Sequence, residues 1–91
     1  SFKLNQNYPN PFNPTTHIAY EIAKMGHTTL QVFDISGRLV KQLASGVTKE
    51  GSYEAAWNGT NEAGQNVVSG VYFYRLTTSD FVSTRKMLLS R

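Results

Sequence analysis

Cysteine is absent from this 91-residue chain, and its absence removes three kinds of chemistry at once. Disulfide bonds, thiolate metal ligands and a cysteine nucleophile are all excluded. The sequence also lacks an apolar run near the roughly 18 residues that a membrane-spanning helix needs, and its start lacks the charged and apolar regions of a secretory signal. A chain of this size buries only about 60 to 65% of its unfolded surface, so we expect one small domain with a single core.

Charge is sparse and spread along the chain. Nine Lys and Arg residues against six Asp and Glu give a net charge of +3, and the only basic cluster is Arg85–Lys86. A nucleic-acid-binding protein typically carries a basic stripe that neutralises several phosphates, so we predict no nucleic-acid partner. The chain begins with Ser1 rather than methionine, which together with the missing signal indicates a piece of a longer protein.

Patterns for catalysis and metal binding are also lacking. His17 and His27 do not have the spacing of metal ligands, and the sequence contains no phosphate-binding loop, nucleophile elbow or paired carboxylates. Asn58–Gly64 carries oxygen atoms suited to calcium, but the turn preferences of Asn and Gly explain this segment better. We therefore predict a protein that is not an enzyme and that has no cofactor and no bound metal.

What the sequence does contain is a strand pattern. Short segments rich in β-branched and aromatic residues recur at roughly ten-residue spacing, with Gly, Asn and Asp between them. This regular spacing predicts an all-β fold without a substantial helix. The fold expected is an immunoglobulin-like antiparallel β-sandwich of six to seven strands over residues 16–91. Strands are expected at residues 16–22, 28–34, 38–43, 52–57, 70–77 and 81–89, with a turn at residues 24–27 and a loop at residues 44–51.

Alternation within these strands predicts which side chains share a face. The faces expected to turn toward the core carry Thr16, Ile18, Tyr20, Ile22, Leu30, Val32, Tyr72, Tyr74 and Leu76. Trp57 shares a face with Tyr53 and Ala55, and it is expected in the core because tryptophan is usually highly buried. A carbohydrate-binding module remains an alternative, in which aromatic side chains such as Trp57 and Tyr53 would be exposed along one flat face.

All three prolines lie within six residues near the start of the chain. Proline cannot donate a ladder hydrogen bond, so this segment is expected to stiffen the chain and to stop regular pairing before residue 16. Residues 1–15 are therefore expected to form a linker and a proline-rich lead-in, whose motif consists of Pro9, Asn10, Pro11, Phe12, Asn13 and Pro14. The PxxP spacing also fits the extended motif that aromatic grooves recognise, although that pattern is loose.

Five segments, in their order along the chain, carry a resemblance to a known family. They are Leu4–Thr15, Val32–Val40, Trp57–Gly64, Ser69–Leu76 and Arg85–Leu89. Through them the chain resembles, nearly end to end, the type A C-terminal sorting domain of the bacterial type IX secretion system, which has a FlgD-like immunoglobulin fold. The resemblance implies a non-catalytic sorting signal at the end of a larger exported protein.

The resemblance also implies partners and a location. The parent protein would reach the periplasm through an ordinary N-terminal signal and would then be recognised by the outer-membrane translocon. A sortase-like peptidase would remove the domain and can attach the N-terminal cargo domain to lipopolysaccharide, so the cargo would end at the cell surface or in the extracellular space. The proline-rich lead-in would hold the cleavable segment away from the folded sandwich.

The C-terminal end of the family carries a basic residue followed by apolar ones, and the matching residues here are the expected translocon-recognition set Arg85, Lys86, Met87, Leu88 and Leu89. Alternation puts Met87 and Leu89 on one face and Lys86 and Leu88 on the other. Basic residues at this position equally suit an edge strand that must avoid aggregation, so both interpretations stay open. The tail Ser90–Arg91 departs from the ending that the family leads us to expect.

A last group of residues matches the family pattern in a structural role. It consists of Asp34, Gly37, Arg38, Trp57, Gly70 and Tyr72. Asp34 and Gly37 have the positions of a type I turn, Gly70 would allow the chain to turn into a central strand, and Tyr72 would anchor that strand by a phenolic hydrogen bond. A FlgD-type domain of a flagellar hook-capping protein resembles the same fold and is a second alternative, although the lead-in and the C-terminal ending favour a sorting domain.

Overall fold

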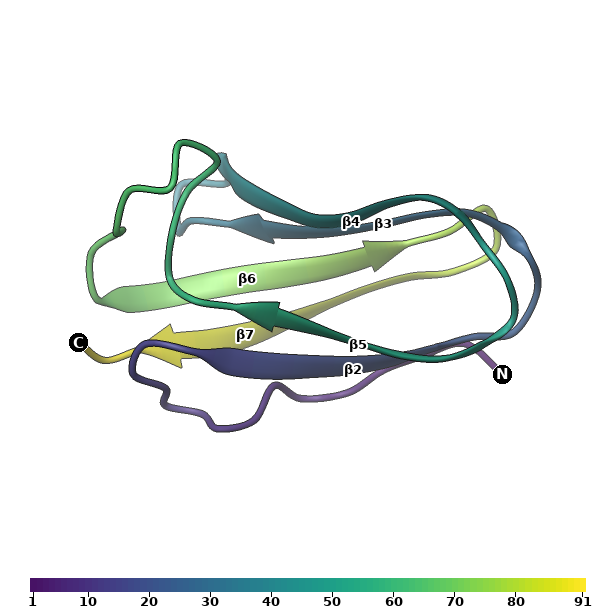
Figure 1. The fold of residues 1–91 in the computed structure, drawn as a ribbon, viewed down its shortest axis with the longest axis horizontal. Helices are drawn as coiled ribbons and strands as arrows, with labels where there is room; N and C mark the ends of the chain where they lie inside the picture. The colour runs from purple at the N-terminus through teal and green to yellow at the C-terminus, as the bar shows by residue number, and fades with distance from the viewer.

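Two antiparallel β-sheets pack face to face in the computed structural model, which describes all 91 residues (Figure 1). The three-stranded sheet has the order β1-β2-β5, formed by Lys3–Leu4, Thr16–Ile22 and Gly51–Trp57. The four-stranded sheet has the order β4-β3-β6-β7, formed by Leu39–Thr48, Gly26–Phe33, Gly70–Thr77 and Val82–Leu89. The predicted all-β immunoglobulin-like sandwich of six to seven strands is thus confirmed. The chain has no helix long and apolar enough to cross a membrane.

The core lies between the sheets and follows the predicted alternation. Along β2, burial alternates at every second residue, and the same period holds for β3 and β6. The expected inward residues are all buried, and Trp57 at the end of β5 joins them in the core. The apolar members are Leu4, Phe12, Ile18, Tyr20, Ile22, Leu30, Val32, Trp57, Tyr72, Tyr74, Leu76, Met87 and Leu89.

The hairpin of β3 and β4 differs from its predicted limits. β4 continues to Thr48, through most of the segment expected as a loop, and β3 begins at Gly26, so His27 lies in a strand rather than in a turn. Register shifts occur between Leu30 and Gln31 and again before Phe33. Such irregularities break the alternation of burial along the paired strand, which is why periodicity could not follow β4 to its end.

Residues 1–15, expected as a linker and a proline-rich lead-in, pack against the sandwich, and no strand forms between Leu4 and Thr16. Lys3 and Leu4 form β1 and pair with Glu21 and Tyr20 of β2. The side chains of Leu4 and Phe12 are buried in the core, as is that of Asn7. Proline excluded a continuous strand here, but it did not prevent separate apolar residues of the segment from filling the core.

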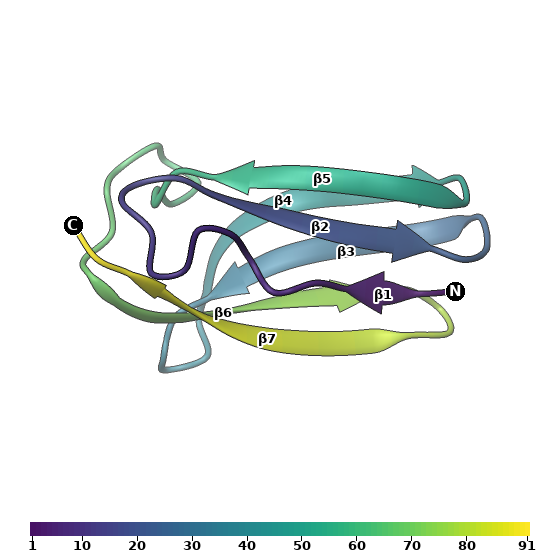
Figure 2. The same ribbon diagram turned by 90° about the horizontal axis from the view of Figure 1, so that it is seen from below.

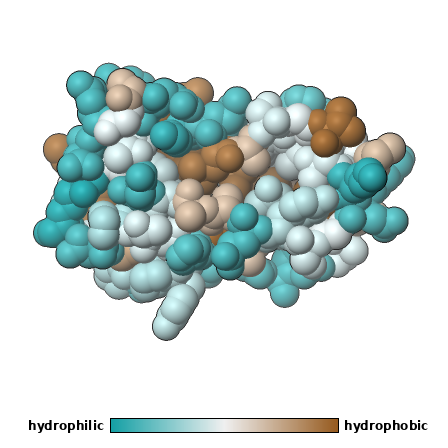
Figure 3. All heavy atoms as spheres, in the orientation of Figure 1, coloured by the Kyte–Doolittle hydropathy of each residue, from teal (hydrophilic) through white to brown (hydrophobic).

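The two termini lie at opposite ends of the sandwich in both views (Figures 1 and 2). In Figure 2, β2 and β5 lie in front of β3 and β4, and the segment after β1 runs between β2 and β7. Figure 3 shows apolar atoms gathered between β4 and β5, where the side of the sandwich is open. These two strands carry the partly buried Val40, Leu43, Ala44 and Ala55, which pack against the core.

Candidate functional site: the lead-in segment and the C-terminal strand

The segment of residues 5–15, here called the lead-in segment, joins the edges of the two sheets. Tyr8 exchanges two backbone hydrogen bonds of 2.9 Å with His17 of β2. Phe12 donates from its backbone N–H to the carbonyl of Leu88 at 3.0 Å and accepts from the N–H of Ser90 at 2.9 Å. The first pair is an antiparallel bridge and the second a parallel one. The lead-in segment therefore closes the side of the sandwich between β2 and β7.

Side chains of the same segment satisfy backbone groups on the outer edge of β7. The amide oxygen of Asn10 accepts from the N–H of Leu88 at 2.9 Å, and the side-chain amide of Gln6 donates to the carbonyl of Lys86 at 2.8 Å. An edge strand with unpaired backbone groups is a template for pairing with another chain. At Lys86 and Leu88 of β7, and at Ser90 just after it, this template is occupied from within the molecule.

Asn7 forms the polar centre of the lead-in segment, and its role was not predicted. Its N–H donates to the Tyr74 hydroxyl at 2.8 Å, and that hydroxyl donates to the carbonyl of Asn5 at 2.7 Å. Its side-chain amide donates to the Thr16 hydroxyl at 2.9 Å. Burial raises the pKa of the Tyr74 hydroxyl above its ordinary value of 10.0, so the group is protonated at neutral pH and can donate. No spacing rule marks a single asparagine in an irregular segment as buried.

Phe12 connects the lead-in segment to the aromatic centre of the core. Its ring centroid lies 5.7 Å from that of Trp57, which in turn lies 5.2 Å from Tyr72 in an edge-on arrangement. The indole N–H of Trp57 donates to the carbonyl of Thr60 at 2.9 Å. These contacts place one residue of the proline-rich motif and two of the structural motif in a single cluster.

The C-terminal strand divides into an inner and an outer set, as alternation predicted. Met87 and Leu89 are buried in the core, whereas Lys86 and Leu88 are exposed. Arg85 reaches across to the other sheet, where its Nε donates to the carbonyl of Leu4 at 2.6 Å. Burial thus assigns Met87 and Leu89 a structural role, and the recognition of the exposed pair by a translocon stays a prediction.

The last residue is fixed to the end of the sandwich. Arg91 donates from its backbone N–H to the Ser69 hydroxyl at 3.0 Å and from Nε to the carbonyl of Val67 at 2.8 Å. Its guanidinium group also donates to the carbonyl of Gly59. The two-residue tail, which matched no expected ending, therefore holds β7 against the segment that connects β5 to β6.

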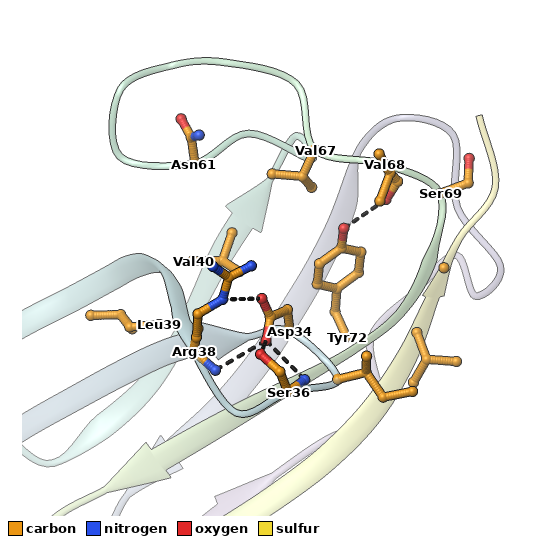
Figure 4. Close-up of a pocket in the computed structure, with 13 residues that line it drawn as sticks. Asp34, Ser36, Arg38, Leu39, Val40, Asn61, Val67, Val68, Ser69 and Tyr72 are labelled. Carbon is orange, nitrogen blue, oxygen red and sulfur yellow. Dashed lines mark hydrogen bonds and ion pairs between the residues drawn. The ribbon is translucent and has the colours of Figure 1, made fainter.

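The β3–β4 turn contains an internally paired carboxylate (Figure 4). Asp34 Oδ1 accepts from the N–H of Ser36 at 2.9 Å, from the Ser36 hydroxyl at 2.6 Å and from the N–H of Arg38 at 3.0 Å. Arg38 Nε donates to Oδ2 at 3.2 Å. Gly37 has a φ of +89°, which suits glycine, and its N–H donates to the carbonyl of Asp34, so the predicted turn is confirmed.

The hydrogen bond from the Ser36 side chain, followed by that from the Arg38 backbone, lowers the pKa of Asp34 from 3.8 to about 2. Because the folded-state pKa is depressed, the stability that the ionised carboxylate contributes is present above about pH 3.8 and is lost as the pH falls through about 2. An NMR titration of the Asp34 carboxyl group measures this directly. Ser36→Ala should move its pKa back toward 3.8, and a wild-type value near 3.8 would contradict the geometry.

An open hollow of about 670 Å³ lies beside this turn, bounded by the turn and the segment before β6. Tyr72 lines it and donates from its hydroxyl to the carbonyl of Val68 at 2.6 Å, which is the predicted anchoring bond. Burial, and then the charge of Asp34, raises the pKa of the Tyr72 hydroxyl. Gly70 enters β6 with a φ of +148°, as a turn into the strand requires.

The sequence pattern of the FlgD Ig-like domain matches residues 12–80, which is most of the chain. The chain belongs to the FlgD Ig-like domain family. Among curated proteins, none matches it. No group of three or more His, Asp or Glu side chains in this FlgD Ig-like domain is placed to hold a metal ion.

Three solved structures resemble this FlgD Ig-like domain over nearly its whole length. Dimeric latent PorU from Porphyromonas gingivalis superimposes with a TM-score of 0.72 at 19% identity, covering 94% of this chain and 9% of PorU. PorZ, an essential bacterial surface component of the type IX secretion system of the same organism, gives 0.65 at 25% identity over 94% of this chain and 11% of PorZ. FlgD from Xanthomonas campestris, described in hook capping for flagellar assembly, gives 0.65 at 20% identity over 96% of this chain and 64% of FlgD.

These comparisons confirm the fold that the sequence resemblance implied, with the chain spanning about a tenth of PorU and PorZ. The structure brings together two predicted sets that lie far apart in the sequence, the proline-rich motif and the C-terminal strand. The turn at Asp34 lines the hollow with Gly70 and Tyr72, and these two residues pair with Leu89 and Met87 of the C-terminal strand. Trp57 is buried in the core, as are Tyr72 and Tyr74, so they do not form the exposed aromatic face that a carbohydrate-binding module would need.

Proposed function

We propose that this domain is a non-catalytic C-terminal sorting signal that directs its parent protein across the outer membrane by the type IX secretion system. The observation that carries the proposal is the likeness to PorZ, a surface component of that system, at 25% identity over 94% of this chain. The C-terminal strand adds support, because it keeps the basic and apolar residues Lys86 and Leu88 on its exposed face. The expected partners are the outer-membrane translocon, a sortase-like peptidase and an N-terminal cargo domain in the same chain.

The placement of the termini suits this role. A cargo domain joined before Ser1 would extend from the end of the sandwich opposite Arg91 (Figure 2), which leaves the C-terminal end free of the cargo. Leu4, just before the lead-in segment, and Phe12 within it belong to the core, which argues against a free spacer at this position. We expect a peptidase cut that leaves the domain folded to fall before Lys3, where β1 begins. The cargo would then be released or anchored at the cell surface.

A reporter fusion tests the proposal. A fluorescent protein with an N-terminal export signal and this chain at its C-terminus is expressed in a bacterium that has a type IX system and in a strain that lacks the translocon. We expect the reporter outside the cell, or on its surface, only in the first strain. The same reporter without this chain is the control and should remain in the periplasm of both strains. Retention of the fusion in both strains would overturn the sorting function.

A second candidate is the immunoglobulin-like domain of a flagellar hook-capping protein. It is favoured by the family match over residues 12–80 and by the structural likeness to FlgD from Xanthomonas campestris. In that case the domain would support hook assembly and would not direct export. Restoration of motility in a flagellated strain, after this domain replaces the corresponding part of its own FlgD, would favour this candidate over sorting.

A further inference from the structure

The outer face of the four-stranded sheet, meaning the face turned away from the core, is unusually apolar for a surface in contact with solvent. Antiparallel sheets with one solvated face normally alternate between apolar inward and polar outward residues. Here the strand register places Leu39 of β4 beside Phe33 of β3, and Phe33 beside Phe73 of β6. Val71 of β6 lies opposite Leu88 of β7. Five apolar side chains thus occupy neighbouring outward positions on four strands.

These apolar residues remain accessible rather than being covered by loops. Leu39 is 52% exposed and Leu88 is 40% exposed, while Phe33 and Phe73 are of intermediate exposure in the middle of the sheet. Contiguous apolar surface of this kind marks interaction sites in soluble proteins, whereas single exposed apolar residues are ordinary. The register makes the set contiguous, because each residue neighbours the next across the sheet.

The same face carries positive charge and no negative charge. Arg75 lies over the ring of Phe33 with 4.6 Å between the guanidinium carbon and the ring centroid, and its Nε donates to the Thr84 hydroxyl at 3.2 Å. Lys86 is the outward neighbour of Phe73 on β7. The strands β3, β4, β6 and β7 contain no Asp or Glu at all. A partner that covers this face meets cations held beside aromatic rings.

The other sheet provides a contrast within the same molecule. Its outward positions on β2 are His17, Ala19 and Glu21, and Glu54 lies opposite Ala19 on β5. Glu54 Oε1 lies 3.6 Å from His17 Nδ1. That face therefore carries mixed charges, because Lys3 of β1 lies opposite Glu21, whereas the strands of the four-stranded sheet have cations and no carboxylates. This difference in charge between the two outer faces gives a partner a basis for choosing between them.

We infer that the outer face of the four-stranded sheet is the docking surface of this domain, and that its partner is a protein surface carrying apolar side chains and carboxylates. The inference rests on the proposed sorting function, in which this partner belongs to the outer-membrane translocon. It widens the recognition site from the C-terminal residues alone to four strands, with Lys86 and Leu88 at one edge of the surface and Phe33, Phe73 and Arg75 at its centre. Met87 and Leu89 act only through the core.

Substitutions that change the charge or the polarity of side chains on the two outer faces test the inference with the reporter fusion described above. The double variant Lys86→Glu/Leu88→Ser should lower the exported fraction about tenfold, since it sets a negative charge against the carboxylates of the partner and removes an apolar contact at the edge of the surface. Gln31→Glu, which places a carboxylate opposite Arg75 without removing a buried group, should lower it several-fold. The matched control Glu54→Lys reverses a charge on the opposite face and should leave export unchanged.

Circular dichroism and thermal unfolding of each purified variant separate recognition from folding. Loss of export by the four-stranded-face variants, with wild-type unfolding curves and normal export of Glu54→Lys, supports the inference. Wild-type levels of export from Lys86→Glu/Leu88→Ser and from Gln31→Glu would overturn it while leaving the sorting function in place. If the unsubstituted fusion itself stays in the periplasm, the sorting function and this inference both fail. An equal loss from Glu54→Lys would show that no single face is recognised.

Discussion

Phe12→Ala is expected to lower the free energy of unfolding of this domain by about 3–5 kcal/mol, the range for truncating a fully buried aromatic side chain. Phe12 is 2% exposed, and its ring contacts Trp57 at the centre of the core. The truncation would leave a cavity at the point where the lead-in segment crosses from β2 to β7. Chemical denaturation of the purified domain, followed by the fluorescence of Trp57, measures the change.

Tyr8→Ala is the matched control for this prediction, because Tyr8 is an aromatic residue of the same segment that is 80% exposed. Its loss should change the free energy of unfolding by no more than about 0.5 kcal/mol. A small effect of Phe12→Ala, similar to that of Tyr8→Ala, would mean that the lead-in segment does not belong to the folded core. The proline-rich segment would then act as the spacer that the sequence suggested.

Leu89→Ala is expected to lower the free energy of unfolding by about 2–5 kcal/mol, whereas Leu88→Ala should change it by about 0.5 kcal/mol. The two residues are neighbours in β7, but Leu89 is 1% exposed and Leu88 is 40% exposed. Thermal or chemical unfolding of the two variants, measured side by side, provides the comparison. Equal destabilisation by both would contradict the division of β7 into inner and outer residues.

The inward residues of β7 make a deletion of the C-terminal end ambiguous, because it would disturb folding as well as recognition. Deleting residues 86–91 would remove Met87 and Leu89 from the core and Arg91 from its contacts with Val67 and Ser69. Loss of export after such a deletion would therefore report unfolding as readily as loss of recognition. Substitutions at the exposed positions Lys86 and Leu88 avoid this ambiguity, since they leave the inward side chains in place.

Both edges of the four-stranded sheet are covered, which limits how another chain can pair with it. The lead-in segment occupies backbone groups of Lys86 and Leu88, and on the opposite edge of this sheet the carboxylate of Glu62 accepts from the N–H of Gln42 in β4 at 2.6 Å. Both edges of the four-stranded sheet are therefore blocked at these positions against strand addition. Recognition of the domain is accordingly inferred to use the face of this sheet and not its edges.

The alternation of apolar residues was sufficient to predict most of the fold. Period-2 patterns in β2, β3 and β6 assigned the buried faces correctly, because each of these strands has one face on a core that only apolar side chains can fill at low cost. The turn at Asp34 was likewise predictable, since Asp and Gly act there through local hydrogen bonds. Such a turn can be predicted because its hydrogen bonds join residues that lie within a few positions of one another in the sequence.

Tertiary structure alone decided the features on which the functional proposals rest. The docking of the lead-in segment on β7 joins residues about 80 positions apart, as in the bond from Gln6 to Lys86, and no local pattern encodes which strand edge such a segment will cover. The burial of Asn7 depends in the same way on the distant Tyr74 hydroxyl. The aromatic and basic face of the four-stranded sheet arises only when strand order and register bring Phe33, Phe73 and Lys86 into one row. Alternation along a single strand specifies which residues face outward, but only the pairing of strands specifies which outward residues become neighbours.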